Sequence, residues 1–142
     1  MPVTTSATNQ AAFELPMNRF AWYAEEVLNK YEPAILNENG YLEPATSTNL
    51  TSASQFVGIC QYPAEKEGEM ATVVKGAFPA VANTAIAAGK LVEVTGSTTT
   101  VNGVVYHTVA AATDNDLDDA TVIGTALTTA SSAGDLVTVL IK

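Results

Sequence analysis

Residue types that can perform acid–base or nucleophilic chemistry are sparse in this sequence. His107 is the only histidine and Cys60 the only cysteine. His107 lies in the run VVYHT, whose alternation predicts a strand, so we expect a half-buried structural histidine rather than a general base. Cys60 lies within the apolar run FVGIC, which favours a small buried side chain over a reactive thiol. The sequence has no nucleotide-binding, serine-hydrolase or zinc-protease motif, so we expect no enzyme and no cofactor.

Carboxylates cluster at two places where a cation could bind. Asp114, Asp116 and Asp118 have the alternating spacing with which a calcium-binding loop begins. An EF-hand loop then needs glycine at its sixth position and glutamate at its twelfth, where this sequence has Asp119 and Thr125. We therefore expect a solvated acidic loop between two strands rather than a metal site. The second cluster, the three glutamates of EKEGE, is expected to form a soluble loop tip.

The composition limits the classes of partner. The chain has 142 residues, of which 47% are hydrophobic and 15% charged, enough for one domain with its own core. No apolar run reaches the roughly 20 residues that a membrane-spanning helix needs, so we expect no membrane partner. The net charge of -9, with Arg19 as the only arginine, argues against direct binding to nucleic acid. The N-terminal MPVTTSATNQ lacks the basic and apolar regions of a secretory signal, so we expect a protein that acts where it is made or leaves by lysis.

One phrase occurs twice in the chain. Residues 56–76 read FVGICQYPAEKEGEMATVVKG, and residues 122–142 read VIGTALTTASSAGDLVTVLIK. In each copy an apolar pair precedes a glycine, a second glycine follows ten residues later, an acid comes next, and a β-branched run closes the phrase. The second glycine supplies a positive φ for a turn, so each copy predicts strand, loop and strand. We infer an internal duplication.

Runs rich in Val, Ile, Thr and Tyr, separated by glycine, proline and polar clusters, predict an all-β protein. The expected strands are residues 19–24, 34–37, 55–62, 69–75, 90–95, 103–109, 121–127 and 135–141. The repeat extends more weakly upstream, where residues 24–40 resemble residues 80–96. Residues 18–31 have helical spacing, but their repeat partner contains Pro79 and Gly89, so we predict a strand, a helical turn and a strand there.

These elements predict a small β-barrel, β-tulip or sandwich formed by residues 19–142 as a single β-domain. Residues 1–18, nearly uncharged and without periodicity, predict an extended N-terminal arm. Residues 45–54, ATSTNLTSAS, predict a polar surface loop.

Aromatic residues concentrate early in the chain. If residues 19–24 form a strand, Phe20 and Trp22 share one face and Tyr23 points to the other. A strand apolar on both faces indicates either burial by a partner or a single thick core, and the sequence leaves both open. The last run, LVTVLI, is also apolar on both faces, which suggests a strand covered on both sides.

A family resemblance arises from two stretches. The segment KGAFPAVANTAIAAGKLVEVTG, followed by VIGTALTTASSAGDLVTVLIK, resembles the small capsid decoration, or cement, proteins of tailed bacteriophages. That family shows an apolar–Gly start, an Ala/Ser-rich loop with a Gly–Asp turn and a valine-rich final strand. Its A-I-x-x-G-x-x-V segment is matched by Ala85, Ile86, Gly89 and Val92. The resemblance covers about residues 20–142.

The resemblance implies a β-barrel or β-tulip that binds the outside of an expanded phage head and stabilises it, often as a trimer, with no catalytic motif. The implied partners are the major capsid protein and other copies of the chain, as a homotrimer. The implied location is the outer surface of the virion, after synthesis in the host cytoplasm. The expected capsid or subunit contacts are Phe13, Leu15, Pro16, Phe20, Trp22 and Tyr23.

Two alternative functions remain. One is a tail or head–neck structural protein of the same virion. The other is a carbohydrate- or ligand-binding β-module, in which Trp22, Tyr23 and Tyr41 would provide stacking surfaces.

Overall fold

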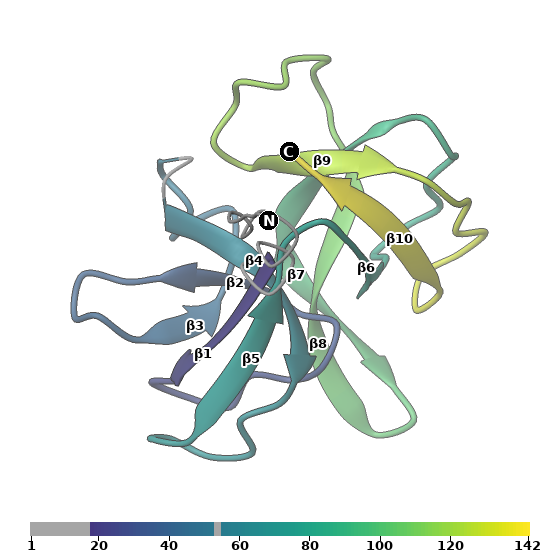
Figure 1. Ribbon diagram of the computed structural model, residues 1–142. Coiled ribbons are helices and arrows are strands. Elements are labelled where there is room, and N and C mark those ends of the chain that lie inside the picture. Colours follow the sequence, from purple (N-terminus) through teal and green to yellow (C-terminus); the bar gives the residue numbers. More distant parts are fainter. Residues whose placement is uncertain (1–17, 53–54) are drawn as a thin grey trace, which may run out of the picture.

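The alternating runs form β-strands throughout the described chain. The computed structural model describes residues 18–52 and 55–142. These residues form ten β-strands and no α-helix (Figure 1), which confirms the all-β prediction. The strands are β1 (Arg19–Tyr23), β2 (Pro33–Leu36), β3 (Leu42–Pro44), β4 (Phe56–Tyr62), β5 (Met70–Val74), β6 (Ala77–Val81), β7 (Leu91–Val101), β8 (Val104–Ala111), β9 (Val122–Ala126) and β10 (Leu136–Ile141).

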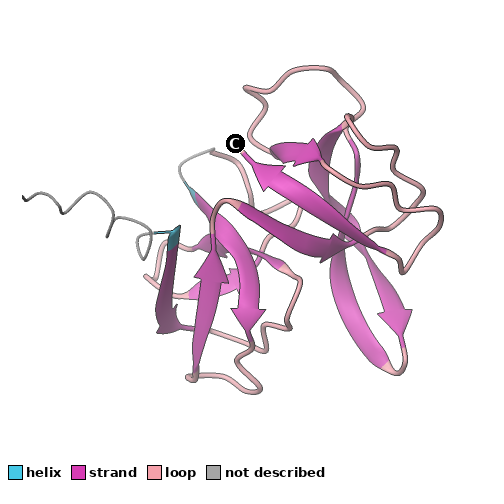
Figure 2. Cartoon of the chain, turned by 45° about the vertical axis from the view of Figure 1, so that its right-hand side comes forward, coloured by secondary structure: helices cyan, strands magenta, loops and turns pink. Residues whose placement is uncertain are grey.

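The strands form two antiparallel sheets with the same topology. The first has the order β1-β5-β4-β2-β3, and the second the order β6-β10-β9-β7-β8. Each strand of the second sheet therefore corresponds to the strand five places earlier in the chain. Figures 1 and 2 show the two sheets as neighbouring groups, joined by the short connection between β5 and β6. The predicted duplication is confirmed, and it extends over both five-stranded units.

Equivalent backbone hydrogen bonds fix the correspondence between the two units. The Leu28 N–H donates to the Ala64 carbonyl at 3.0 Å, and the Ile86 N–H donates to the Ala130 carbonyl at 2.9 Å. The Gly68 N–H donates to the Ala24 carbonyl, as the Gly134 N–H does to the Ala82 carbonyl. Ala24 thus corresponds to Ala82, two residues beyond the partner that the sequence predicted. The predicted alignment was wrong by two residues because the small apolar residues of the two segments match equally well at either offset. The hydrogen bonds identify a single offset.

The first glycine of each repeated phrase lies where two strands approach closely. A Cβ on Gly58 would overlap the carbonyl oxygen of Val74, and a Cβ on Gly124 would overlap that of Leu140. Both glycines adjoin a register shift, between β2 and β4 in one unit and between β7 and β9 in the other. Glycine is therefore required at both positions by space, as is usual at a β-bulge with a close backbone neighbour.

The second glycine and the acid that follows it close the loop of each phrase. Gly68 and Gly134 have φ values of 87° and 91°. The Glu69 carboxylate accepts a hydrogen bond from the Glu65 N–H at 2.8 Å. The Asp135 carboxylate accepts the N–H groups of Ser131 and Ser132, both at 3.1 Å. The repeated Gly–acid pair is thus a loop-closing device.

The buried apolar side chains form two hydrophobic clusters. The larger joins both units, because Ile35, Phe56 and Ile59 of the first unit pack with Val92 and Ile123 of the second. The smaller lies within the first unit and contains Leu28, Leu42, Cys60 and Val73. Cys60 is fully buried, which confirms the prediction of a small buried side chain, and burial raises the pKa of its thiol to about 12.

Four sequence predictions need correction. β3 and β6 were not expected; β6 contains Pro79, which is tolerated because β6 is an edge strand. The helical turn within residues 18–31 is not formed, because Leu28 makes a bridge to Ala64 instead. The polar loop at residues 45–54 is not wholly on the surface, because Ala45 and Leu50 are buried in the larger cluster.

Candidate functional site

The predicted contact residues that the structure describes lie together on the edge strand β1. Phe20 pairs with Val73, Trp22 with Ala71 and Tyr23 with Met70 across β5. Phe20 and Trp22 therefore share the face of the buried residues of β5, and Tyr23 lies on the opposite, outer face, as predicted. All three aromatic side chains are more than one-third exposed. Phe13, Leu15 and Pro16 lie outside the described residues.

The Trp22 ring is fixed by two contacts. Its Nε1–H donates to the Gly40 carbonyl at 2.7 Å, on the turn between β2 and β3. The Trp22 and Tyr23 ring centroids are 5.9 Å apart in an edge-to-face arrangement. Such a fixed, half-exposed aromatic group loses little conformational entropy when a partner covers it.

Tyr23 is part of an exposed apolar surface that the sequence analysis did not identify. On the outer face of the β1–β5–β4 sheet, Tyr23 is 48% exposed, Met70 48% and Tyr62 57%. Tyr62 pairs with Thr72, two residues from Met70 on the same face of β5. We call Tyr23, Met70 and Tyr62 the outer aromatic face. The sequence held a signal for this face: alternation in MATVV places Met70 opposite the buried residues of its strand, and Tyr62 ends the run FVGICQY.

The last strand has a comparable surface in the second unit. Val137 and Val139 of β10 are buried, whereas Leu136 and Leu140 are almost half exposed. The described chain therefore covers one face of β10 well and the other only in part. Cover of the second face by a neighbouring subunit stays a prediction.

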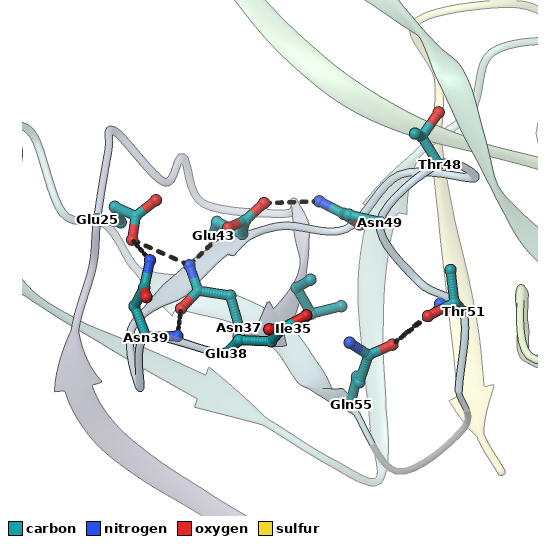
Figure 3. A pocket seen from close by; sticks show the side chains of 10 residues that line it. All are labelled: Glu25, Ile35, Asn37, Glu38, Asn39, Glu43, Thr48, Asn49, Thr51 and Gln55. Carbon is teal, nitrogen blue, oxygen red and sulfur yellow. Dashed lines mark hydrogen bonds between the residues drawn. The ribbon is translucent and has the colours of Figure 1, made fainter.

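A polar cavity opens beside the turn between β2 and β3 (Figure 3). Its volume is about 420 Å³. Figure 3 shows its carboxylates and amides turned toward one another. The Asn37 amide donates to Glu43 at 2.6 Å and to Glu25 at 3.2 Å, and the Asn49 amide donates to Glu43 at 2.8 Å. The lining residues are Glu25, Ile35, Asn37, Glu38, Asn39, Glu43, Thr48, Asn49, Thr51 and Gln55.

A second cavity of about 490 Å³ adjoins the first, and Glu25 lines both. The second cavity lies at the end of β1, against the loop between β4 and β5. Its lining residues are Ala24, Glu25, Tyr41, Glu67 and Gly68.

The acidic loop after β8 is closed by the last residue of the sequence. The Lys142 ammonium donates to the carbonyls of Leu117 at 2.8 Å and Asp119 at 2.9 Å. The positive charge of Lys142 therefore lies against this acidic loop. Over residues 18–52 and 55–142, no group of three or more His, Cys, Asp or Glu side chains is arranged to hold a metal ion.

His107 connects the two units through a buried carboxylate. Glu32 of the first unit is 1% exposed and His107 of β8 is 30% exposed. The His107 N–H donates to Glu32 Oε2 at 2.7 Å, and His107 Nδ1 lies 2.6 Å from the same oxygen. Glu32 Oε1 accepts the Asn29 N–H at 2.7 Å, and the Asn29 amide donates to the Val105 carbonyl at 3.1 Å. The predicted half-buried structural histidine is confirmed, while its partner was not identified from the sequence.

This contact should make the stability depend on pH. The hydrogen bond to Glu32 raises the pKa of His107 above its ordinary value of 6.5, although burial opposes the shift. When the pKa of His107 is higher in the folded than in the unfolded protein, its contact with Glu32 stabilises the fold fully at a pH below the unfolded-state pKa. That stabilisation is lost as the pH rises through the folded-state pKa. We expect the free energy of unfolding in urea to fall as the pH rises above about 6.5 and through the raised folded pKa of His107. His107→Asn should flatten this slope, and an equal slope in both proteins would contradict the assignment.

The comparisons with known proteins agree with this architecture. Residues 40–142 match the family model described as phage cement protein. The chain belongs to the phage cement protein family. The resemblance drawn from residues 75–96 and 122–142 is thereby confirmed, and the protein is a structural protein of a phage head. The family is structural, and it associates with a phage capsid as part of the virion.

A solved structure shares the fold of this cement protein. The chain is similar to the head fiber gp8.5 N base of bacteriophage phi29, with a TM-score of 0.59 and 18% sequence identity. The match covers 87% of this chain and 92% of the phi29 chain, so both five-stranded units take part. No curated protein matches the chain. Within the described residues, no helix is long and apolar enough to cross a membrane.

Proposed function

We propose that this protein binds the outer surface of an expanded phage head and stabilises it, with the major capsid protein as its partner. Besides the family, the outer aromatic face carries the proposal. Three large side chains gathered on one exposed sheet face are typical of a protein contact surface. The protein is made in the host cytoplasm and joins the head there. It contacts the head through this face, through Phe20 and Trp22 on the other face of β1, and through an arm formed by residues 1–18.

A shell offers many equivalent sites, which suits a modest contact repeated by symmetry. We propose that the protein acts as a homotrimer, with residues 19–142 as its single β-domain. When one subunit has bound, the others meet their sites at a high effective concentration, so several weak contacts give strong attachment. Direct binding to nucleic acid has no part in this proposal, because the chain carries a net charge of -9. A membrane has no part in it either, because no apolar run has the length of a membrane-spanning helix.

Tyr23→Ser tests this surface. Tyr23 is half exposed and forms an edge-to-face pair with Trp22, so its loss should cost the free protein little. We expect attachment to purified heads to weaken about tenfold, the effect of losing one anchoring aromatic residue. Leu127→Ser is the matched control, because Leu127 is equally exposed but lies in the second unit. Equal attachment of both variants at wild-type strength would contradict the proposed face.

A further inference from the structure

The two units differ in the length of one hairpin, and the difference leaves one of them open. The β7–β8 hairpin is much longer than β2–β3, its equivalent, and projects downward in Figure 1. Its side chains cover one side of its own unit. Val101 approaches the Cβ position of Gly134 to 3.3 Å, and the Thr99 hydroxyl donates to Asn83 Oδ1 at 3.1 Å.

The equivalent place in the first unit has no such cover from the described chain. Gly68 corresponds to Gly134, and no atom lies within 4 Å of its Cβ position. Val81 of the second unit is 2% exposed, whereas Tyr23, its equivalent, is 48% exposed. The second cavity, of about 490 Å³, lies where the long hairpin would run if the units were identical. We call it the Gly68 cavity.

The groups around the Gly68 cavity indicate which segment fits. An extended segment with β-branched side chains would cover Gly68 as Thr99 and Val101 cover Gly134. The position of Asn83, which accepts the threonine hydrogen bond, is taken in the first unit by Glu25. Glu67 also lines the cavity, so two carboxylates favour a cationic donor.

A second copy of this chain fits these groups poorly. It also carries a net charge of -9, and the projecting hairpin end, TTTVNGVVY, contains no basic residue. Electrostatic complementarity therefore favours a different, basic partner.

We propose that the Gly68 cavity binds an extended, basic segment of the capsid protein, laid over Gly68 as the β7–β8 hairpin is laid over Gly134. A Lys or Arg of that segment pairs with Glu25 and Glu67. The inference rests on the proposed function, and it names the segment chemistry and the place on this chain that receives it.

Charge reversal within one loop tests the inference. Glu67→Lys places a positive charge at the cavity, while Glu65→Lys makes the same change in net charge on the same loop, outside the lining. Both residues are exposed, so thermal unfolding of both full-length variants should match the wild type. We expect Glu67→Lys to weaken binding to purified heads about tenfold, with a smaller salt dependence, and Glu65→Lys to weaken it less than twofold.

The outcomes separate the two proposals. If wild-type protein binds heads and both variants bind equally, the Gly68 cavity is not the receiving site, although the proposed function stands. If the wild-type protein does not bind heads, the proposed function fails and the inference fails with it. Binding weakened tenfold by Glu67→Lys alone supports the cavity assignment.

Discussion

Gly124→Ala is expected to lower the free energy of unfolding by about 3 kcal/mol, a large effect for one methyl group. The new Cβ would overlap the backbone carbonyl of Leu140 on the neighbouring strand. A backbone oxygen held in the sheet cannot move aside as a flexible side chain can, so β9 and β10 must separate locally. Urea unfolding measures the change.

Gly40→Ala is the matched control for this substitution. Gly40 has a φ of 83°, but among the described residues no atom beyond its chain neighbours lies within 4 Å of its Cβ position. Alanine there meets only the backbone cost of a left-handed conformation, about 1 kcal/mol. If Gly124→Ala costs no more than Gly40→Ala, close packing is not the reason for the first glycine of the repeated phrase.

Glu32→Ala is expected to destabilise the protein by about 3 kcal/mol, because it removes the acceptor of several buried hydrogen bonds. The N–H groups of Asn29 and His107 lose their acceptor, and the link that Glu32 makes between the first unit and β8 is lost. Glu38→Ala is the control, because Glu38 is exposed, and its effect should stay within about 0.5 kcal/mol.

Hydrogen exchange locates the Glu32 effect. We expect the amides of Asn29 and His107 to exchange faster in Glu32→Ala than in Glu38→Ala, ahead of global unfolding. Unchanged protection at both amides, together with unchanged stability, would show that Glu32 does not join the units.

The sequence was informative where the requirement is local. Strands alternate apolar and polar residues, and glycines recur at fixed spacing where a turn or a close approach needs them. The repeat around Gly58 and Gly124 could therefore be recognised from the sequence. The acids after Gly68 and Gly134 belong to the same local pattern. The resemblance to the cement proteins was drawn from this pattern together with the Ala85 to Val92 segment.

Features that depend on contacts between residues far apart in the chain could not be predicted from the sequence. Glu32 and His107 are 75 residues apart and belong to different units, and no periodicity connects them. A charged residue among apolar neighbours before β2 was the available signal that Glu32 needed a partner. β6 was missed because Pro79 is acceptable only at a sheet edge, and edge position is a property of the whole sheet.

The candidate site was predicted in part. Phe20, Trp22 and Tyr23 were placed correctly on the two faces of one strand, because alternation alone decides that. Met70 and Tyr62 were not joined to them, because their neighbourhood depends on the order β1-β5-β4. The Gly68 cavity exists because the β2–β3 hairpin is shorter than its equivalent, β7–β8. That equivalence is known only once the strands of the two units have been matched.

The most direct test of the proposed function is cosedimentation of the purified full-length protein with expanded phage heads that lack it. Bound protein is measured per major capsid protein subunit as the added concentration rises. The account predicts binding that saturates at a fixed ratio set by the shell symmetry, with heads that then release DNA at a higher temperature. Binding that never saturates, or no binding at all, would contradict it.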